Sequence, residues 1–387
     1  MGKIGIGLIG CGGRLRGVVN EVFKATDQLE VIALCDPNPH SIDTAKKRFN
    51  DKASIYENHE DLVRDPDIQW VFIGSWNSLH AKHAIAAFEA GKHVFCEKPL
   101  ALSVEDCIAM RDAWKASGKM FTIGFTLRYS PHYLKIKEII SSGTIGDVIS
   151  MEFNETLDFN HGGYIHADWR RKTEWAGSHL LEKCCHDIDL VNWIVDSTAI
   201  KVASFGGCDF FKPENEHHVE RLGSNEKGNK AYQTWNASHI SNNIGNPFSD
   251  DKDILDNQVA IIEFANGVRS TFHTNCNCAI PERRMYICGT EGTLRADVID
   301  GTIDVKKIGF ETKTIDMSTE AKGGHGGGDS ILGQSIASSI LEGTPSKTKL
   351  EDGLRSAFTA FGIDEAQRTG SVINLEELWA KADIPIS

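Results

Sequence analysis

The stretch GKHVFCEKPLAL at residues 91–102 decides the fold, because a short apolar run ends there in residues of sharply different chemistry. The run at 93–96 is short and β-prone, as expected of a buried parallel strand. Pro99 has no N–H to donate to a sheet, so the strand should end before it. Lys98 would then lie at the carboxyl end of a strand, the edge where open α/β sheets bind ligands. Two interpretations stay open here: an ordinary surface lysine, or a partly buried lysine that acts as an acid or a charge anchor.

The composition limits the class of protein. The chain has 387 residues, of which 41% are hydrophobic, and this suits two domains of ordinary size. A formal net charge of −13 without a basic block argues against nucleic acid or an anionic membrane surface as a partner. Residues 1–10 have the pattern of neither a secretory signal nor a membrane span. We therefore expect a cytoplasmic protein that binds small molecules.

Cysteine usage points the same way. The ten cysteines lie mostly in apolar segments, so we expect reduced thiols rather than disulfides. Neither Cys184-Cys185 nor Cys276-x-Cys278 has the spacing of zinc ligands, and we expect no metal site.

A glycine turn follows the first expected strand, residues 3–9. The sequence GCGGRLR at 10–16 places Gly10, Gly12 and Gly13 where backbone N–H groups can face a diphosphate. Leu15 occupies the third glycine position of G-x-G-x-x-G, and we expect it to hinder close packing of the first helix on its strand. The motif is therefore imperfect.

A second strand, residues 30–35, strengthens the prediction of a dinucleotide site. It ends in Asp36, where a carboxylate can accept the hydroxyls of an adenosine ribose and repel a 2′-phosphate. No arginine follows at 38–40, so we expect NAD rather than NADP. The alternative is that Asp36-Pro37 forms only a turn.

Strand and helix signals then alternate. Strands at 69–74, 93–96 and 120–124 alternate with helices at 78–90 and 103–117, which predicts a doubly wound parallel sheet of Rossmann type over residues 1–125. We expect the dinucleotide to be bound by residues at the strand ends and in the glycine turn: Gly10, Gly12, Gly13, Arg14, Leu15, Asp36, Ser75, Trp76, Asn77, His80, Glu97, Lys98 and Arg128.

Residues 126–387 should form a second α/β domain, whose C-terminal helix can pack back on the first domain. After a crossover helix to about residue 142, strand-like segments adjoin through turns, with a hairpin signal at 265–267. This pattern predicts an open, mostly antiparallel sheet with strands near 148–154, 201–206, 257–264, 268–274, 284–289 and 302–307. Residues 209–256 are polar and indicate an excursion, either a lid or a surface decoration.

One long helix, expected over residues 178–196, carries ionisable residues. Glu182, His186, Asp189 and Trp193 follow at steps of four, three and four and should share one face. A solvated stripe is one interpretation. The other is an acid–base pair, because a carboxylate one turn before a histidine can hold one imidazole tautomer and support its protonated form.

Together these motifs resemble the Gfo/Idh/MocA family, the glucose–fructose oxidoreductase and inositol dehydrogenase superfamily. The resemblance rests on the glycine turn, Asp36, Asn77 with His80, Glu97-Lys98-Pro99, and an acid four residues before His186. It implies a Rossmann domain with NAD, and a second domain whose open sheet forms a homodimer or homotetramer contact. It also implies that Lys98 contacts the reacting hydroxyl and that His186 is the general acid/base.

The chain departs from the family pattern at two places. Glu182 stands where the family usually has Asp, and Ser75-Trp76 replaces the usual Thr-Pro before Asn77. The longer Glu182 side chain is still expected to orient His186.

Further segments resemble pocket elements of sugar-acting members. Residues 323–329, GGHGGGD, indicate either a linker or a loop that presents His325 to a substrate hydroxyl. Trp169-Arg170 resembles a W-R element that lines the pocket, and Arg128-Tyr129 follows the strand at 120–124. We expect substrate contacts from these residues and from the catalytic set: Lys98, Tyr129, Trp169, Arg170, Glu182, His186 and His325.

The resemblance predicts an NAD-dependent dehydrogenase that oxidises a hydroxyl of a sugar, polyol or cyclitol, or reduces the corresponding ketone. Two alternatives stay open. The first is an NAD-dependent glycoside hydrolase that oxidises sugar C3 transiently, and the second is a non-catalytic nucleotide-binding protein on the same fold.

Overall fold

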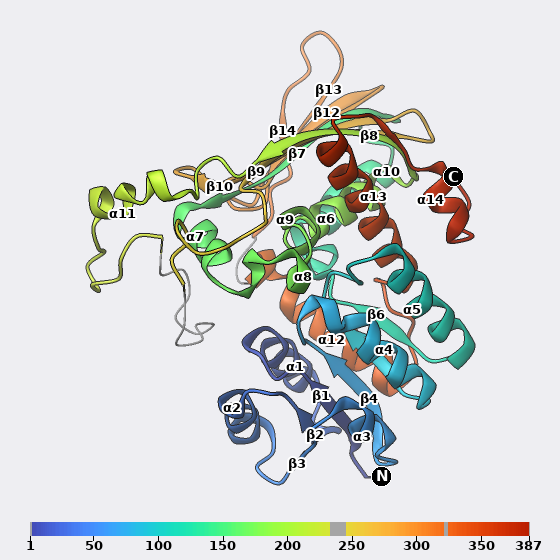
Figure 1. Ribbon diagram of the computed structural model, residues 1–387. Helices are drawn as coiled ribbons and strands as arrows, with labels where there is room; N and C mark the ends of the chain where they lie inside the picture. Colours follow the sequence, from blue (N-terminus) through green and yellow to red (C-terminus); the bar gives the residue numbers. More distant parts are fainter. Residues whose placement is uncertain (1, 233–244, 321–323, 387) are drawn as a thin grey trace. The chain divides into compact units, whose positions relative to one another are not determined.

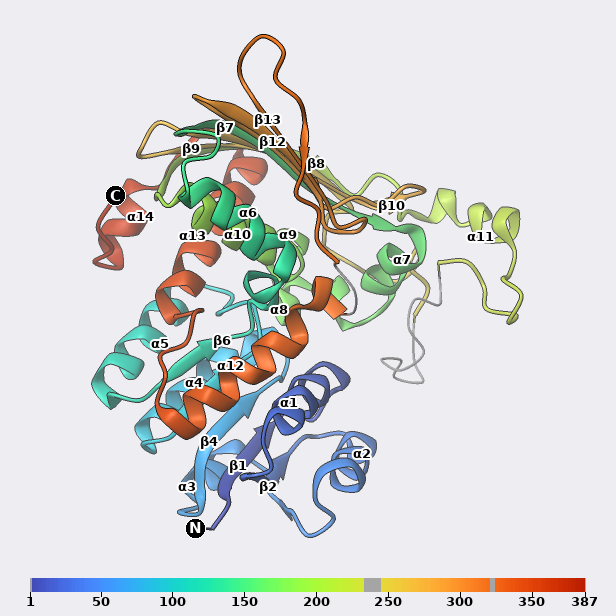
Figure 2. The ribbon, with the colours of Figure 1, turned by 180° about the vertical axis from the view of Figure 1, so that it is seen from behind.

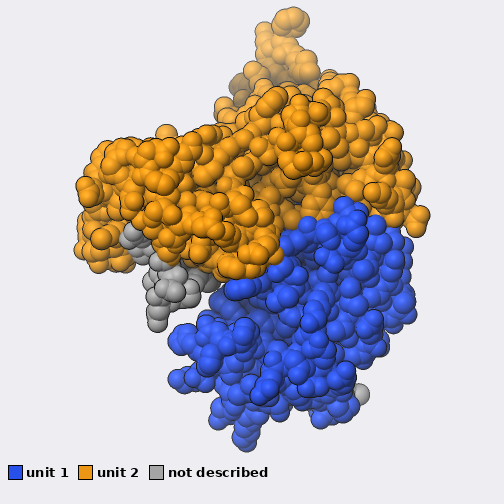
Figure 3. Space-filling view, in the orientation of Figure 1, with its two compact units in different colours: residues 1–129, 327–357 blue, residues 130–326, 358–387 orange. Residues whose placement is uncertain are grey.

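The computed structural model describes residues 2–232, 245–320 and 324–386. The chain forms two compact units, coloured separately in Figure 3. Unit 1 comprises residues 1–129 and 327–357, and unit 2 comprises residues 130–326 and 358–387. The boundary expected at residue 125 lies close to the first passage of the chain between the units. Residues 327–357 were expected in the second domain but belong to unit 1, which is a larger difference from the expected division.

Unit 1 is built on a parallel sheet whose strand order, within the described residues, is β3-β2-β1-β4-β5-β6 (Figure 1). This order reverses beside β1, as in dinucleotide-binding folds. The expected doubly wound parallel sheet is therefore confirmed. Its strands are β1 (Ile4–Ile9), β2 (Leu29–Cys35), β3 (Ser54–Ile55), β4 (Ile68–Ile73), β5 (His93–Cys96) and β6 (Phe121–Ile123).

The helices of unit 1 begin and end where the sequence gives local signals. For example, the Ser103 side chain accepts the Asp106 N–H at the start of α5, and Gly118 ends that helix in the left-handed region. The set comprises α1 (Gly13–Ala25), α2 (Pro39–Phe49), α3 (His59–Arg64), η1 (Asn77–Leu79), α4 (His80–Glu89), α5 (Val104–Ser117), η2 (Thr126–Tyr129), α12 (Gly328–Glu342) and the first part of α13 (Leu350–Thr369).

Helix α12 belongs to unit 1 although it comes late in the chain. Its Leu332 and Ile336 join Leu15 and Val18 of α1 in one buried apolar cluster. The two helices approach closely at Gly333, where a Cβ atom would lie 2.6 Å from the Glu21 carbonyl carbon. The helix that completes the first unit is thus α12, whereas the last helix, α14 (Glu376–Lys381), belongs to unit 2.

Unit 2 is built on a mixed sheet with the order β14-β13-β12-β11-β7-β10-β9-β8-β15 in the described part of the chain. Neighbouring strands are antiparallel except β7 and β10, which are parallel. The expected mostly antiparallel sheet is confirmed, although β12, β14 and β15 were not predicted. The strands are β7 (Val148–Asp158), β8 (Ala199–Gly207), β9 (Asn257–Phe264), β10 (Arg269–Cys278), β11 (Arg284–Gly289), β12 (Gly292–Asp297), β13 (Thr302–Lys307), β14 (Ile315–Asp316) and β15 (Ile373–Asn374).

Helices cover one face of this sheet. Figures 1 and 2 show α6, α10 and the later part of α13 on the same side of the strands. None of the described helices combines the length and the apolar character needed to cross a membrane. The helices of unit 2 not yet given are α6 (Pro131–Ser141), α7 (Phe159–Ala167), η3 (Trp169–Arg171), α8 (Thr173–Ala176), α9 (His179–Glu182), α10 (Cys185–Val195), η4 (Pro213–Asn215), α11 (His217–Leu222) and η5 (Gly324–Gly327).

The prediction of one helix over residues 178–196 was wrong. Helix α9 ends at Glu182 and α10 begins at Cys185, with a turn between them. The Cys184 carbonyl accepts the N–H groups of Asp187 and Ile188 and so starts the new helix. Polar and apolar side chains alternate at helical intervals on both sides of this turn. The sequence pattern therefore did not reveal the break between the two helices.

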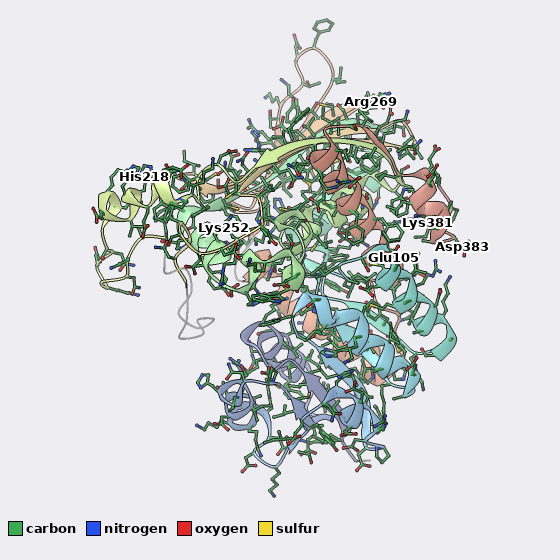
Figure 4. All side chains as sticks on the ribbon, viewed as in Figure 1. Glu105, His218, Lys252, Arg269, Lys381 and Asp383 are labelled. Carbon is green, nitrogen blue, oxygen red and sulfur yellow. The ribbon has the colours of Figure 1, made fainter. Side chains whose placement is uncertain are left out.

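The excursion at residues 209–256 has a core of its own in the part that the structure describes. Phe211, Tyr232 and Phe248 are buried together with Leu157 and Tyr164 of the neighbouring segments. Figure 4 labels His218 on α11 and Lys252 ahead of β9. Residues 233–244 lie outside the described residues. The described part is a packed surface addition to unit 2.

Candidate active site

The glycine turn has the backbone geometry of a diphosphate cradle. Gly10 has φ 81°, and a Cβ atom there would lie 2.3 Å from the Ser75 nitrogen. Gly12 caps α1 without a side-chain hydrogen bond, and Gly13 is the first residue of that helix. A helix start whose first N–H groups are not capped by a side chain attracts an anionic group. These residues therefore fit the diphosphate of a dinucleotide.

Leu15 does not hold α1 away from the sheet as the sequence suggested. Its side chain is buried, and a Cβ atom on Gly74 would lie 2.6 Å from the Leu15 Cβ atom. The glycine that the motif lacks on the helix is thus replaced by Gly74, which follows β4. Leu15 serves the site by packing.

Asp36 lies at the end of β2 with its carboxylate directed to backbone amides. One oxygen accepts the Cys11 N–H at 2.6 Å and the other accepts the Asn38 N–H at 2.7 Å. Burial raises the pKa of the Asp36 carboxyl, while these hydrogen bonds and the charge of Arg16 lower it. Arg16 thus supplies a positive charge close to Asp36, although residues 38–40 contain no arginine.

Arg14 has contacts that the sequence did not predict. Its guanidinium donates to Glu97 at 2.8 Å, to Thr126 Oγ1 at 2.7 Å and to Asp329 at 2.7 Å. It therefore joins the glycine turn to the Glu97-Lys98-Pro99 motif, to the segment after β6 and to the start of α12. Asp329, the last residue of the GGHGGGD motif, acts here in unit 1.

Lys98 follows β5, which ends at Cys96 as the sequence predicted. Its neighbour Glu97 is buried beside Gly124, where a Cβ atom would lie 2.8 Å from Glu97 Oε2. On the other side of Lys98, the Pro99 carbonyl lies 2.8 Å from Nδ1 of His80. The Glu97 side chain on one side of the lysine and the Pro99 carbonyl on the other are thus held by side chains of unit 1.

The segment after β4 divides into buried and exposed positions. Trp76 is 45% exposed, whereas Asn77 and His80 are buried. The Ser75 hydroxyl lies 2.9 Å from Nδ1 of His83, and the Ser75 carbonyl lies 3.2 Å from Nε2 of His80. His80 therefore contacts protein backbone, and the cofactor contacts of Ser75, Trp76 and Asn77 stay predictions.

Arg128 and Tyr129 lie inside unit 1. Arg128 is buried and forms an ion pair with Asp352 at 3.0 Å. The Tyr129 hydroxyl is 3.1 Å from Thr348 Oγ1, and its side chain is fully buried. Tyr129 is therefore a core residue, and the prediction that it contacts substrate is not supported by its place in the fold.

In unit 2 the ionisable face of α9 and α10 is buried. Glu182 is 5% exposed, His186 4% and Asp189 1%. This burial excludes the solvated stripe, because charged groups are rarely buried without partners or a role. The interpretation of this face as the site of an acid–base pair therefore stays as a prediction.

Arg170 holds the acid of this face. It donates to Glu182 at 3.1 Å and forms an ion pair with Asp168 at 3.1 Å. Its guanidinium carbon lies 4.5 Å from the ring centre of Trp169, a cation–π geometry. The sequence predicted that Trp169 and Arg170 line the pocket, and the structure pairs Arg170 with Glu182 and places it over Trp169.

His325 lies close to His186, although the two are far apart in sequence. Their ring centres are 5.7 Å apart. His325 has φ 51°, an uncommon value for a residue with a side chain, and the Ser130 hydroxyl holds the next residue by donating to the Gly326 carbonyl at 2.9 Å. Such backbone strain is frequent at functional sites. Gly323 of the same motif lies outside the described residues.

A buried ion-pair network anchors the start of α10. Arg283 donates to both carboxylate oxygens of Asp187, at 2.7 and 2.8 Å, and pairs with Glu155 at 3.0 Å. Lys183 pairs with Glu155 at 3.2 Å. The guanidinium and the ammonium hold the pKa of Glu155 at about 2, against the effect of burial. The network joins β7, α10 and the segment before β11. No sequence motif indicated these ion pairs.

His161 is another residue that the sequence analysis missed. Burial, together with the charge of Lys183, lowers the pKa of the His161 imidazole well below its usual range. Glu155 and Glu182 act in the opposite direction. A neutral imidazole therefore lies beside the charged groups of this part of unit 2.

Comparison with protein families assigns both parts of the chain to one family. Residues 4–125 match the NAD-binding Rossmann fold of the Gfo/Idh/MocA oxidoreductases, and residues 137–375 match the C-terminal alpha/beta domain of the same family. The chain belongs to the Gfo/Idh/MocA family. It is thus an oxidoreductase whose first unit binds NAD.

Two relatives show which proteins the chain resembles in sequence. The chain is 26% identical over 348 residues to the putative oxidoreductase YteT of Bacillus subtilis, covering 78% of this chain and 81% of that protein. It is 34% identical over 197 residues to an inositol 2-dehydrogenase of Gluconacetobacter diazotrophicus, covering 50% of this chain and 55% of the relative. The match thus spans about half the length of that dehydrogenase.

A solved structure shares the fold over nearly the whole chain. Levoglucosan dehydrogenase in complex with NADH and levoglucosan superimposes with a TM-score of 0.78 at 22% identity. The superposition covers 97% of this chain and 100% of that chain. At this identity the likeness shows the fold alone.

Proposed function

We propose that this protein oxidises a hydroxyl group of a neutral sugar, polyol or cyclitol, or reduces the corresponding ketone. NAD supplies the hydride acceptor when it is bound. None of the ten cysteines, all of which lie within the described residues, is in a disulfide bond, and a reducing compartment suits them, so we propose the cytoplasm as the site of the reaction.

The observation that carries the proposal is the burial of His186 beside His325. Both are titratable side chains that can contact substrate hydroxyl groups. We propose that His186 takes the proton of the reacting hydroxyl and that Lys98 stabilises the negative charge that develops on its oxygen. Glu182 supports this chemistry as a buried acid near the start of α10.

The charges around Arg170 favour a neutral substrate. Its guanidinium is already paired with the carboxylates of Asp168 and Glu182. A substrate carboxylate would have to displace one of them, whereas a hydroxyl group can accept from or donate to the pair. We therefore propose that sugar acids are poorer substrates than neutral sugars.

Gly10, Gly12 and Gly13 would hold the diphosphate of NAD, and Asp36 its adenosine ribose. This assignment is supported by the uncapped start of α1 and by the strand-end position of Asp36. Asn77, Trp76 and Ser75 are proposed as further contacts because they follow β4 at the same edge of the sheet as Asp36.

We also propose that two copies associate through the open face of the unit 2 sheet. Phe205, Val259 and Ile261 are exposed there, although they are large and apolar. They line a groove of about 330 Å³ together with residues of β7 and β10. Exposed apolar patches commonly mark interaction sites. Light scattering of the protein and of Phe205→Glu tests this, since the variant should shift toward the monomer.

The test of function is a screen of free sugars, polyols and aryl glycosides with NAD. We expect NADH, followed at 340 nm, to accumulate in proportion to the sugar or polyol oxidised. A glycoside hydrolase would instead release aglycone without net NADH, and removal of NAD would abolish the release. Absence of both products with every substrate would favour a non-catalytic nucleotide-binding protein.

A further inference from the structure

His80 lies between two backbone carbonyls on the buried side of the Lys98 motif. It is the first residue of α4 and is 1% exposed. Its Nδ1 atom is 2.8 Å from the Pro99 carbonyl oxygen, and its Nε2 atom is 3.2 Å from the Ser75 carbonyl oxygen. One ring therefore contacts the chain just after β4 and just after Lys98.

The protonation state decides which contact is the hydrogen bond. Burial lowers the pKa of the His80 imidazole, so the neutral ring, with a single N–H, is favoured. Both neighbours are carbonyl oxygens, and only one can receive that proton. The contact to Pro99 is the shorter, which assigns the N–H to Nδ1 and makes Pro99 the acceptor.

This hydrogen bond has a counterpart on the other side of Lys98. The Glu97 carboxylate accepts from Arg14 at 2.8 Å, and Arg14 is itself fixed by Thr126 and Asp329. A lysine carries its charge on a flexible stem, so the direction in which the stem leaves the backbone limits where the ammonium can go. The residues on both sides of Lys98 are thus fixed by buried or partly buried side chains.

We propose that His80 is a positioning residue for Lys98, acting through the hydrogen bond from its imidazole to the Pro99 carbonyl. This proposal rests on the proposed role of Lys98 at the reacting hydroxyl. His80 does not touch the reacting atoms in this assignment. Loss of its hydrogen bond frees the Pro99 carbonyl and lets the Lys98 backbone change direction, which misplaces the ammonium.

The first experiment compares three variants in steady-state kinetics with NAD and the best substrate of the screen. His80→Leu removes the donor, and we expect kcat to fall at least tenfold while the dissociation constant of NAD stays within twofold. In His80→Asn, the amide nitrogen can take the place of Nδ1, and we expect most of kcat to return. His83→Leu is the matched control, because His83 is similarly buried one turn along α4 and contacts the Ser75 side chain instead of Pro99.

The second experiment reads Lys98 directly, without substrate. Reductive ¹³C-methylation labels the lysines, and loss of one signal in Lys98→Arg assigns the Lys98 resonance. We expect this resonance and its titration midpoint to shift in His80→Leu and to return toward wild type in His80→Asn. An unshifted Lys98 resonance, or a kcat within twofold of wild type, in folded His80→Leu would overturn the proposal.

Two further comparisons test the proposal if His80→Leu does not fold or if Lys98 has no role in turnover. If His80→Leu does not fold, His80→Asn and His80→Gln are compared, since their amide nitrogens mimic Nδ1 and Nε2 respectively. We then expect the higher kcat in His80→Asn, and the reverse order would contradict the proposal. Normal turnover in Lys98→Ala would instead contradict the role of Lys98, while the resonance experiment still tests the contact of His80.

Discussion

Lys98 in unit 1 and His186 in unit 2 are held by different kinds of contact. Beside Lys98, the Pro99 carbonyl contacts the His80 ring, and the Glu97 carboxylate pairs with Arg14, which is partly exposed. The start of α10, which carries His186, is anchored by the ion pairs of Arg283 with Asp187 and Glu155. A backbone contact survives wherever one donor is retained, whereas a buried ion pair leaves an uncompensated charge when one partner is removed. The two sites should therefore respond differently to substitution.

The largest effect is expected at Arg283. Arg283→Met removes the cation that pairs with both Asp187 and Glu155, while Lys183 still pairs with Glu155. Removing one partner of a buried ion pair costs about 3–5 kcal/mol, and we expect the free energy of unfolding to fall by that amount in urea denaturation. Arg64→Met is the control in unit 1, because Arg64 and its partner Asp61 are both exposed, with 71% and 56% of their side chains accessible. For this variant we expect a loss of about 1 kcal/mol or less, and equal losses would contradict the comparison.

Substitution of the two side chains that we propose to react with substrate should affect catalysis instead of stability. We expect Lys98→Ala and His186→Ala each to lower turnover by about 10²-fold or more, the usual effect of losing an acid–base group. NAD binding should stay close to wild type in His186→Ala, since the NAD-binding residues belong to unit 1. Steady-state kinetics and calorimetric titration with NAD measure the two effects. Near-normal turnover in either variant would remove that residue from the mechanism.

A smaller effect is expected at Asp36. Asp36→Ala removes the charge that opposes a 2′-phosphate, while Arg16 stays nearby. We expect the ratio of NADP to NAD dissociation constants to fall by about tenfold, that is by about 1.4 kcal/mol. Asp43→Ala, an exposed acid on α2, controls for the general change in charge. An unchanged ratio in Asp36→Ala would show that Asp36 does not select the cofactor.

An effect of similar size concerns pH and Asp364, a partner of α9. Asp364 accepts from the Ser178 hydroxyl, and burial raises the pKa of Asp364 to about 6. A raised pKa means that the fold favours the protonated acid, so its stabilising contribution is present at low pH and is lost as the pH rises through about 6. We expect wild type to lose roughly 1–2 kcal/mol between pH 4 and pH 7 from this group. Asp364→Asn should lose less over the same interval in urea denaturation, and an identical pH dependence would contradict this.

The sequence predicted the surroundings of Lys98 better than those of His186, and the reason is physical. In a parallel α/β unit the site residues follow strand ends, so short motifs such as residues 10–16 and 97–99 reveal them. Strand β5 was predicted with its observed ends. Contacts that cross the unit, such as Arg14 with Asp329, were not predicted because no spacing encodes them.

In unit 2 the sequence revealed individual residues but not their partners. It singled out Glu182, His186 and His325, and the structure brings the last two together. It could not show that Glu182 pairs with Arg170, or that Arg283 anchors α10, because these contacts join segments 12 and 96 residues apart. The break between α9 and α10 escaped for a related reason, since side-chain periodicity continues through the turn.

The late position of α12 in the chain has a consequence for synthesis on the ribosome. When residues 1–129 have emerged, the apolar surface of α1 that Leu332 and Ile336 cover is still without its partner. About two hundred further residues, the bulk of unit 2, must be translated before α12 is made. The nascent nucleotide-binding unit therefore exposes this apolar surface of α1 until α12 has been translated.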